Sequence, residues 1–233
     1  MRDTGESAVN DNLQVVECKT KEVGRRLVEA YGEPRWQADH DPIPQLVSTI
    51  LSQNTNDVNR DVAFQRLRAQ FPTWEEVRDS DVALVIEAIR PAGLANQKGP
   101  RIQESLRFIT QEQGKLSLDF LVDWPVEEAK VWLSSMKGVG PKTAAIVLLF
   151  SLGRPAFPVD THVHRVAKRL GLIGPTTSRE KAHEELERLV APENYYAFHL
   201  NMIQHGRLVC SSRKPSCAEC PLRDLCTYYR KQG

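Results

Sequence analysis

Four cysteines near the C-terminal end of the chain have the clearest capacity for chemistry. They follow the spacing Cys-x6-Cys-x2-Cys-x5-Cys, at Cys210, Cys217, Cys220 and Cys226. Thiolates are soft ligands that select zinc or an iron–sulfur cluster over harder cations. The loop contains no histidine and is more compact than two separated Cys-x2-Cys knuckles of zinc sites. We therefore expect a [4Fe-4S] cluster, for which ligation by cysteine alone is usual. A zinc loop and a pair of disulfides are the alternatives.

Composition sets the broad class of the protein. The chain has 233 residues, of which 26% are charged and 41% hydrophobic, so it can bury a substantial core. Residues 1–12 are polar, and no apolar run is long enough for a membrane span or a signal peptide. We expect a protein of a reducing compartment, the cytoplasm, associated with the nucleoid if the source is bacterial. Disulfides are rare in such compartments. Cys18 lies far from the other cysteines and is interpreted as a bystander.

Net charge gives no overall signature of nucleic-acid binding, because it is only +1. The C-terminal stretch is different. Residues 201–233 contain six Lys or Arg and two acidic residues. Such a basic patch could face a phosphate backbone, and it could equally be a solvated tail.

Helical periodicity dominates the chain, and alternating patterns typical of strands are absent. Two capping boxes, Thr73 with Glu76 and Thr177 with Glu180, mark helix starts. We predict an all-α protein with roughly ten helices joined by short connections.

A glycine-rich turn between two helices is the second informative segment. One helix is expected to end at Gly138, and another to begin at Pro141, with Val139 and Gly140 between them. Glycine lets another backbone approach closely, and free amides at a helix start attract anions such as a phosphate. The alternative is an ordinary turn between two packed helices.

Two ionisable residues follow this turn. Lys142 lies in the first turn of its predicted helix, where a cation is electrostatically disfavoured, so its amine is a candidate nucleophile. Asp160 precedes another helix in the segment Phe157-Pro158-Val159-Asp160-Thr161-His162. A helix N-cap is the plainer role for this aspartate, and it is compatible with a catalytic one.

Together, the hairpin ending in Lys142, the VDTH segment with Asp160 and the cysteine loop resemble the endonuclease III family of helix-hairpin-helix DNA glycosylases. The likeness extends from about Val23 to Cys226. It implies two helical domains that flank a DNA-binding cleft. Residues 39–147 would form a six-helix barrel with the hairpin. Residues 21–38 and 148–233 would form the iron–sulfur cluster domain, preceded by a polar extension, 1–20.

The resemblance implies excision of oxidised pyrimidines from duplex DNA, followed by cleavage of the abasic site. The damaged base would be extruded into a pocket. Lys142 would attack C1′ and form a Schiff base, and Asp160 would activate it. A monofunctional glycosylase for another lesion or mismatch, or a non-catalytic DNA-binding module, are the other readings. We expect a monomer.

The resemblance also implies roles for residues outside the catalytic pair. Gln53 and Asn54 would fill the space of the extruded nucleotide, and Leu94 would wedge into the duplex. Arg213 and Lys214 would meet phosphates. The lesion pocket would include Ser52, Ser134 and His162. Family members usually have glutamine where Asn54 stands and glutamate where Ser134 stands, so the lesion spectrum can differ. Helix capping by Gln53 and Asn54, and packing of Leu94 beneath its turn, are the plainer alternatives.

Overall fold

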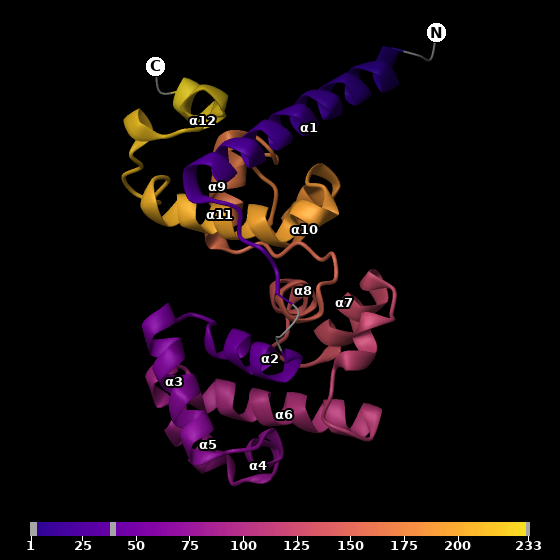
Figure 1. Cartoon of the computed structure of the whole chain (residues 1–233), viewed down its shortest axis with the longest axis vertical. Helices are drawn as coiled ribbons and strands as arrows, with labels where there is room; N and C mark the ends of the chain where they lie inside the picture. Colours follow the sequence, from indigo (N-terminus) through magenta and orange to yellow (C-terminus); the bar gives the residue numbers. More distant parts are fainter. Residues whose placement is uncertain (1–3, 38–40, 232–233) are drawn as a thin grey trace. The chain divides into compact units, whose positions relative to one another are not determined.

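The computed structural model describes residues 4–37 and 41–231, with side chains from residue 13 onward in the first segment. Every regular element within these ranges is a helix, which confirms the all-α prediction. The chain forms two compact units. The central unit comprises residues 37–154, and the terminal unit combines residues 1–36 with residues 155–233 (Figure 1).

The central unit is built around a short apolar helix, α2 (Pro42–Leu51), which contacts α3, α6 and α8. Its side chains Leu46, Val47, Ile50 and Leu51 are almost fully buried. This spacing places apolar groups on more than one face, as a helix at the centre of a bundle requires. The other helices of the unit are α3 (Asp57–Gln70), α4 (Trp74–Asp79), α5 (Val82–Ala88), α6 (Ala95–Gln113), α7 (Val126–Ser135) and α8 (Pro141–Ile146). Two short 3-10 turns, η1 (Arg90–Ala92) and η2 (Asp119–Val122), and a π-helical turn, η3 (Val147–Ser151), complete it.

Helix starts in both units follow from local side-chain capping. The capping box of Thr73 and Glu76 is confirmed at the start of α4. The second predicted box is wrong, because Ser178 caps α10 and accepts a hydrogen bond from the Lys181 amide. The Thr177 hydroxyl instead bonds to Glu185. Serine and threonine are both good N-caps, so two adjacent ones leave the helix start ambiguous by one residue.

The terminal unit joins the two ends of the chain. Helix α1 (Thr4–Tyr31) contacts α11 (Tyr195–Leu208), and α11 contacts α9 (Thr161–Leu170). The first of these helices begins at Thr4, so most of the polar stretch 1–20 is helical. Val23 and Leu27 on α1 are fully buried. The remaining elements are α10 (Arg179–Leu189), α12 (Thr227–Arg230) and the 3-10 turns η4 (Pro192–Asn194), η5 (Cys217–Glu219) and η6 (Arg223–Leu225).

Within residues 4–37 and 41–231, none of the helices combines the length and the apolar character that crossing a bilayer would require.

Candidate nucleic-acid interface and cluster site

The glycine hairpin lies between α7 and α8 in the central unit. Helix α7 ends at Ser135, three residues before the predicted end at Gly138. The Val139 amide donates to the Met136 carbonyl at 3.0 Å, which closes the turn, and the Val139 side chain is buried. Gly138 has a φ of +88°, in the left-handed region that favours glycine. The helix is shorter than predicted because the Val139 amide bonds to the carbonyl three residues earlier, in a turn, and not to the carbonyl four residues earlier, as a continuing α-helix would require.

Gly140 is the N-cap residue of the next helix, α8, and no side chain caps this helix start. It precedes Pro141, and a Cβ added at Gly140 would meet no atom within 4 Å. The surface beside this residue is therefore open to a second backbone. Amides at an uncapped helix start need a partner from outside the helix. The hairpin thus has the geometry expected of a phosphate contact.

Lys142 lies in the first turn of α8, and its side chain is half-buried. Its neighbours Thr143, Ala144 and Ala145 are buried, so the helix is anchored behind the lysine. The helical run continues from Ile146 into the π-helical turn η3. Such π-helical turns are frequent at functional sites. The amine is therefore carried on a rigid element.

The segment after α2 contacts this hairpin directly. The Gln53 side-chain amide donates to the Gly138 carbonyl at 2.9 Å. Asn54 is exposed and has a φ of +52°, a conformation that asparagine tolerates better than most residues. Asn56 caps α3 by accepting from the Asn59 amide. The Ser52 hydroxyl donates to the Thr49 carbonyl at 2.7 Å. Of the predicted residues, Gln53 is thus brought to the hairpin.

A second protruding turn precedes α6. Leu94 has a φ of +50°, and its side chain is 48% exposed, so it does not pack beneath the turn. The preceding Gly93 also has a positive φ, +67°. An exposed leucine on a left-handed turn is an apolar side chain held away from the core. Ser134, at the end of α7, is exposed as well.

Asp160 lies in the terminal unit, at the start of α9. Its carboxylate accepts from the Val163 amide at 2.7 Å, which is an N-cap. His162 is half-buried and its Nδ1 lies 3.1 Å from Nη2 of Arg165. Lys142 belongs to the central unit, so each member of the predicted catalytic pair is described in its own unit.

The four cysteines of the C-terminal loop surround one cavity in the terminal unit. Cys210, Cys217, Cys220 and Cys226 all line it, together with Arg169, Arg223 and His205. Among the described residues that line this cavity there is no aspartate or glutamate. A cluster held by four thiolates carries negative charge, so basic side chains at its edge suit it. The donor set and its surroundings therefore fit an all-cysteine cluster.

Arg169 on α9 holds the first part of this cysteine loop, and sequence reasoning missed it. Its guanidinium donates to the carbonyls of Ser211 and Ser212, at 2.7 and 2.9 Å. One nitrogen also lies 3.2 Å from the Cys210 sulfur, and the guanidinium stacks on the Tyr228 ring at 4.7 Å. The planar guanidinium can make these contacts at once.

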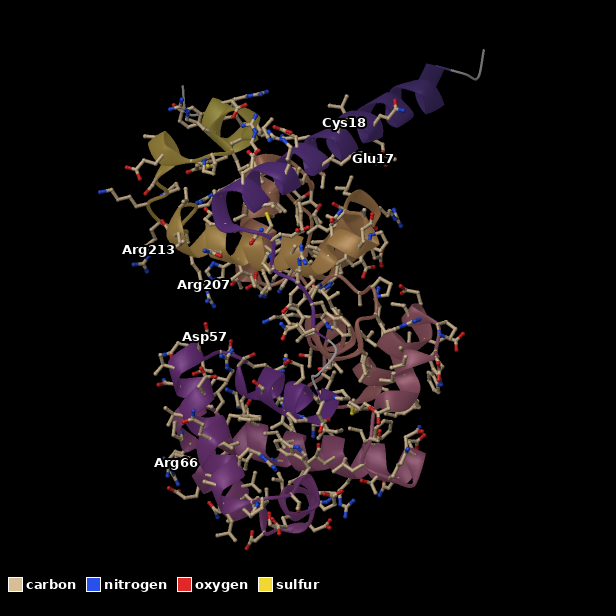
Figure 2. The ribbon with its side chains drawn as sticks, viewed as in Figure 1. Glu17, Cys18, Asp57, Arg66, Arg207 and Arg213 are labelled. Atoms are coloured by element: carbon tan, nitrogen blue, oxygen red, sulfur yellow. The ribbon has the colours of Figure 1, made fainter. Side chains whose placement is uncertain are left out.

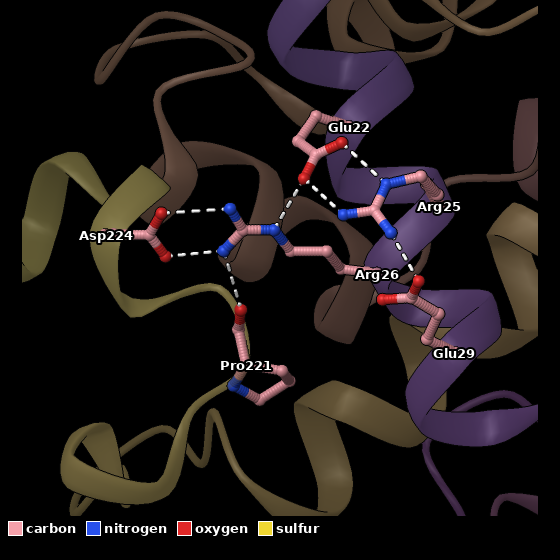
Figure 3. Close-up of polar contacts among 6 residues, drawn as sticks. All are labelled: Glu22, Arg25, Arg26, Glu29, Pro221 and Asp224. Carbon is pink, nitrogen blue, oxygen red and sulfur yellow. Dashed lines mark hydrogen bonds and ion pairs between the residues drawn. The ribbon is translucent and has the colours of Figure 1, made fainter.

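Helix α1 holds the second part of the loop (Figure 3). Arg26 forms a bidentate ion pair with Asp224, at 2.5 and 3.0 Å, and donates to the Pro221 carbonyl at 3.1 Å. It also bonds to Glu22 on its own helix. The Arg26 guanidinium lowers the pKa of the Asp224 carboxyl below its usual range. Residues almost two hundred positions apart in the chain are joined here, so no local sequence pattern could have found the pair.

His205 connects α1 with the cavity. Its Nδ1 lies 2.9 Å from the Tyr31 hydroxyl, and its Nε2 lies 3.6 Å from the Cys220 sulfur. Burial lowers the pKa of His205 to about 4, so the ring is neutral at pH 7. Burial also raises the pKa of the Cys220 thiol to about 11. A thiolate at this position therefore requires a bound metal, which displaces the proton.

Two basic side chains lie on the outer surface of the cysteine loop. Arg213 and Lys214 are both exposed. Figure 2 shows Arg213 on the loop and Arg207 at the end of α11, each extending away from the ribbon. These side chains are accessible to an anionic partner.

Comparison with known proteins identifies the class that this fold and these sites define. Residues 47–192 match the family described as HhH-GPD superfamily base excision DNA repair protein. Residues 210–226, from the first to the last cysteine of the loop, match the iron–sulfur binding domain of endonuclease III.

Individual relatives agree with this class. Endonuclease III of Thermotoga maritima is 33% identical over 213 residues, which are 91% of this chain and 94% of that protein. An Arabidopsis thaliana relative, provisionally assigned as a DNA glycosylase, is 40% identical over 75% of this chain but only 59% of its own length. A solved endonuclease III, trapped as a covalent intermediate with DNA, has a TM-score of 0.80 at 26% identity, over 93% of this chain and 98% of the other.

The chain belongs to the endonuclease III family of the helix-hairpin-helix base excision repair superfamily. This family consists of DNA glycosylase/AP lyase enzymes. Because residues 210–226 match the family's iron–sulfur binding domain, the chain carries a [4Fe-4S] cluster.

Proposed function

We propose that this chain is a monomeric, bifunctional DNA glycosylase and AP lyase that removes oxidised pyrimidines from duplex DNA. The observation that carries the proposal is the place of Lys142, half-buried in the first helical turn after an open glycine hairpin. A relative of known structure was trapped as a covalent intermediate with DNA, which supports covalent catalysis, and Lys142 is our candidate for the nucleophile. We place its action on chromosomal DNA in a reducing compartment.

Binding begins with contacts to the phosphate backbone. Gly138 and Gly140 would offer main-chain amides to a phosphate, and the Val139 amide closes the turn between them by its bond to the Met136 carbonyl. Arg213 and Lys214 would offer charge. Contacts of this kind position the enzyme without reading sequence. They release counterions, so affinity must fall as salt is raised.

Base extrusion then exposes the damaged nucleotide. In this proposal Leu94 enters the stack, and Gln53 and Asn54 occupy the space that the nucleotide leaves. The exposure of Leu94 and Asn54 supports these roles. The bond of Gln53 to the Gly138 carbonyl would couple this segment to the hairpin. Three further residues, Ser52, Ser134 and His162, would line the lesion pocket.

The proposed reaction uses Lys142 and Asp160. Asp160 accepts a proton from the lysine, and the neutral Nζ bonds to C1′ while the bond from C1′ to the base breaks. The base leaves with the electron pair and is protonated. Ring opening gives a Schiff base between Nζ and C1′. A proton leaves C2′, its electrons expel the 3′ phosphate, and water then hydrolyses the Schiff base to free the amine.

The partnership of Asp160 with Lys142 is itself part of the proposal, because the two residues lie in different units. Among the described residues, the Asp160 carboxylate bonds to the Val163 amide through Oδ1. An N-cap bond of this kind fixes the orientation of the carboxylate. The second oxygen can then serve the reaction.

We assign the cluster to the four thiolates of Cys210, Cys217, Cys220 and Cys226. When bound, the cluster supplies rigid cross-links between four points of a short loop, and folding energy with them. The proposed chemistry at Lys142 transfers no electron. Arg169 and Arg26 orient the loop that presents Arg213 and Lys214.

Borohydride trapping on a duplex with an abasic site tests the proposal. Hydride adds to the Schiff-base carbon and leaves a stable bond between protein and DNA. We expect an adduct with wild-type protein and none with Lys142→Ala. Lys137→Ala is the matched control, since Lys137 lies exposed in the same hairpin. It should trap at saturating protein.

The competing functions give different results. Base release without an adduct would indicate a monofunctional glycosylase. DNA binding with neither product would indicate a non-catalytic module. Duplexes that carry single defined lesions would then establish which oxidised base is preferred.

A further inference from the structure

A lysine of the central unit is buried where a hydrophobic residue would be expected. Lys98 is the fourth residue of α6, and only 1% of its surface is exposed. Its ammonium donates to the Leu51 carbonyl at 2.7 Å and to the Ala92 carbonyl at 2.8 Å. One nitrogen therefore links two residues that are 41 positions apart in the chain.

Both carbonyls belong to the last residue of a helical element. Leu51 ends α2, and Ala92 ends η1. Carbonyls at a helix end lack intrahelical partners, and a cation there is favoured by the helix dipole. The lysine thus satisfies two helix ends that would otherwise be buried without donors.

Directly after each carbonyl, the chain leaves the core and forms an exposed turn. The turn after Leu51 contains Asn54, and the turn after Ala92 contains Leu94. In the part of the chain that the structure describes, Asn54 and Leu94 are the two non-glycine residues with positive φ. The backbone amide of Lys98 also donates to the Leu94 carbonyl at 3.0 Å. Side chain and backbone of one residue therefore anchor the bases of both turns.

This arrangement is a poor one for stability alone. Burial lowers the pKa of Lys98. A buried charge is costly to desolvate, and an apolar side chain of similar volume often stabilises a protein as well or better. What the lysine provides, and an apolar residue cannot, is a fixed spacing between two turns.

We infer that Lys98 is a positioning residue, which fixes the Asn54 turn and the Leu94 turn relative to each other so that both enter a duplex together. The inference rests on the proposed function, because it assigns both turns to DNA. Unstacking a base step is costly, and holding both inserted groups in place beforehand lowers the cost of reaching the extruded state. Without the lysine, each turn would move independently.

The test compares Lys98→Met with Gln103→Met. Gln103 is a matched control on the same helix, 1% exposed, whose side-chain amide also bridges two carbonyls, those of Val77 and Ser80, each at 2.8 Å. These carbonyls precede no turn assigned to DNA. Lys98→Gln, which keeps donor hydrogens on a shorter neutral side chain, replaces the methionine variant should that variant fail to fold.

Three quantities are measured for each variant: thermal stability, affinity for undamaged duplex, and the single-turnover rate of base release at saturating protein. We expect Lys98→Met to lower that rate by about a hundredfold, as small misplacements of reacting groups do. Its affinity for undamaged duplex and the salt dependence should stay unchanged. Gln103→Met should lose comparable stability and keep the rate.

Equal rates in the two variants would overturn the inference, because the effect of Lys98 would then be one of stability alone. The inference would also be overturned if Lys98→Met lowered the rate of base release and the affinity for undamaged duplex by similar factors. Failure of the proposed function is distinguishable, since it would show as absence of base release and trapping in the wild-type protein.

Discussion

Replacement of Gly140 by alanine tests whether the hairpin backbone touches a phosphate. The new methyl group would meet no atom within 4 Å, and the φ of −99° is allowed for alanine. Folding should therefore be unaffected or favoured by up to about 1 kcal/mol, since alanine restricts the unfolded chain. Gly138→Ala differs, because its φ of +88° lies in the left-handed region. That variant should lose about 1–2 kcal/mol of unfolding free energy.

The effect of Gly140→Ala on DNA binding follows from contact geometry. A phosphate oxygen bonded to a main-chain amide lies about 2.9 Å from the nitrogen, so it and its neighbours approach the position of the methyl group. Loss of one charge-assisted hydrogen bond costs about 1.5–3 kcal/mol. The dissociation constant should therefore rise about ten- to hundredfold. The slope of log affinity against log salt should fall by about one phosphate contact.

Fluorescence anisotropy with an undamaged duplex, across a salt series, measures both quantities, and thermal denaturation measures stability. Gly114→Ala controls for the strain of a positive φ, since Gly114 has a φ of +70° and open space around it at the end of α6. It should bind DNA like wild type and lose no more stability than Gly138→Ala, where the new methyl group would also lie 2.7 Å from Cδ of Arg101 and displace that side chain. If Gly140→Ala keeps the wild-type affinity and salt slope, no phosphate approaches that amide and the hairpin contact is refuted.

Arg26→Ala should make the protein lose its cluster to a chelator faster, because the substitution removes the ion pair between Arg26 and Asp224. The decay of visible absorbance measures this loss. The pKa of Asp224 is depressed by Arg26, so its stabilisation is present above the pKa of the unfolded carboxyl and is lost as pH falls through the lower, folded value. Wild-type protein should therefore lose cluster stability on acidification more steeply than Asp224→Asn, and parallel curves would contradict this. His205→Leu removes a hydrogen-bond donor from the Cys220 sulfur, so the reduction potential should become more negative, whereas Tyr31→Phe should shift it less; a redox titration followed by electron paramagnetic resonance decides.

Features that depend on a few neighbouring residues were predictable from the sequence. The cysteine spacing predicted the loop that surrounds one cavity, and the paired glycines predicted the hairpin, because both depend on local chain geometry. The capping box at Thr73 was predictable for the same reason. The start of α10 was missed by one residue where Ser178 competes with its neighbour, and neither sequence pattern nor propensity separates two adjacent N-caps.

Contacts between distant residues were not predictable. Lys98 has the sequence appearance of a charged residue near a helix start, where exposure is the ordinary expectation. Its burial depends on carbonyls of Leu51 and Ala92 that tertiary packing brings together. The pair of Arg26 and Asp224 likewise joins the two ends of the chain. Periodicity reports which face of a helix is apolar, but not which partner that face will meet.

In each unit, a cation that bonds to main-chain carbonyls fixes the position of a loop with a proposed function. Lys98 does so for the two turns of the central unit, and Arg169 does so for Ser211 and Ser212 of the cysteine loop. Carbonyl oxygens carry only partial charge, so these bonds fix the backbone without a carboxylate partner. Lys98 is buried, and one nitrogen of Arg169 lies 3.2 Å from the Cys210 sulfur, so each cation acts through the position of its loop and not through its own charge. Exchanging Arg169 for a neutral hydrogen-bonding residue should release the segment that presents Arg213 and Lys214 and so weaken DNA binding. The same exchange of Lys98 should slow base release and leave affinity for undamaged duplex unchanged.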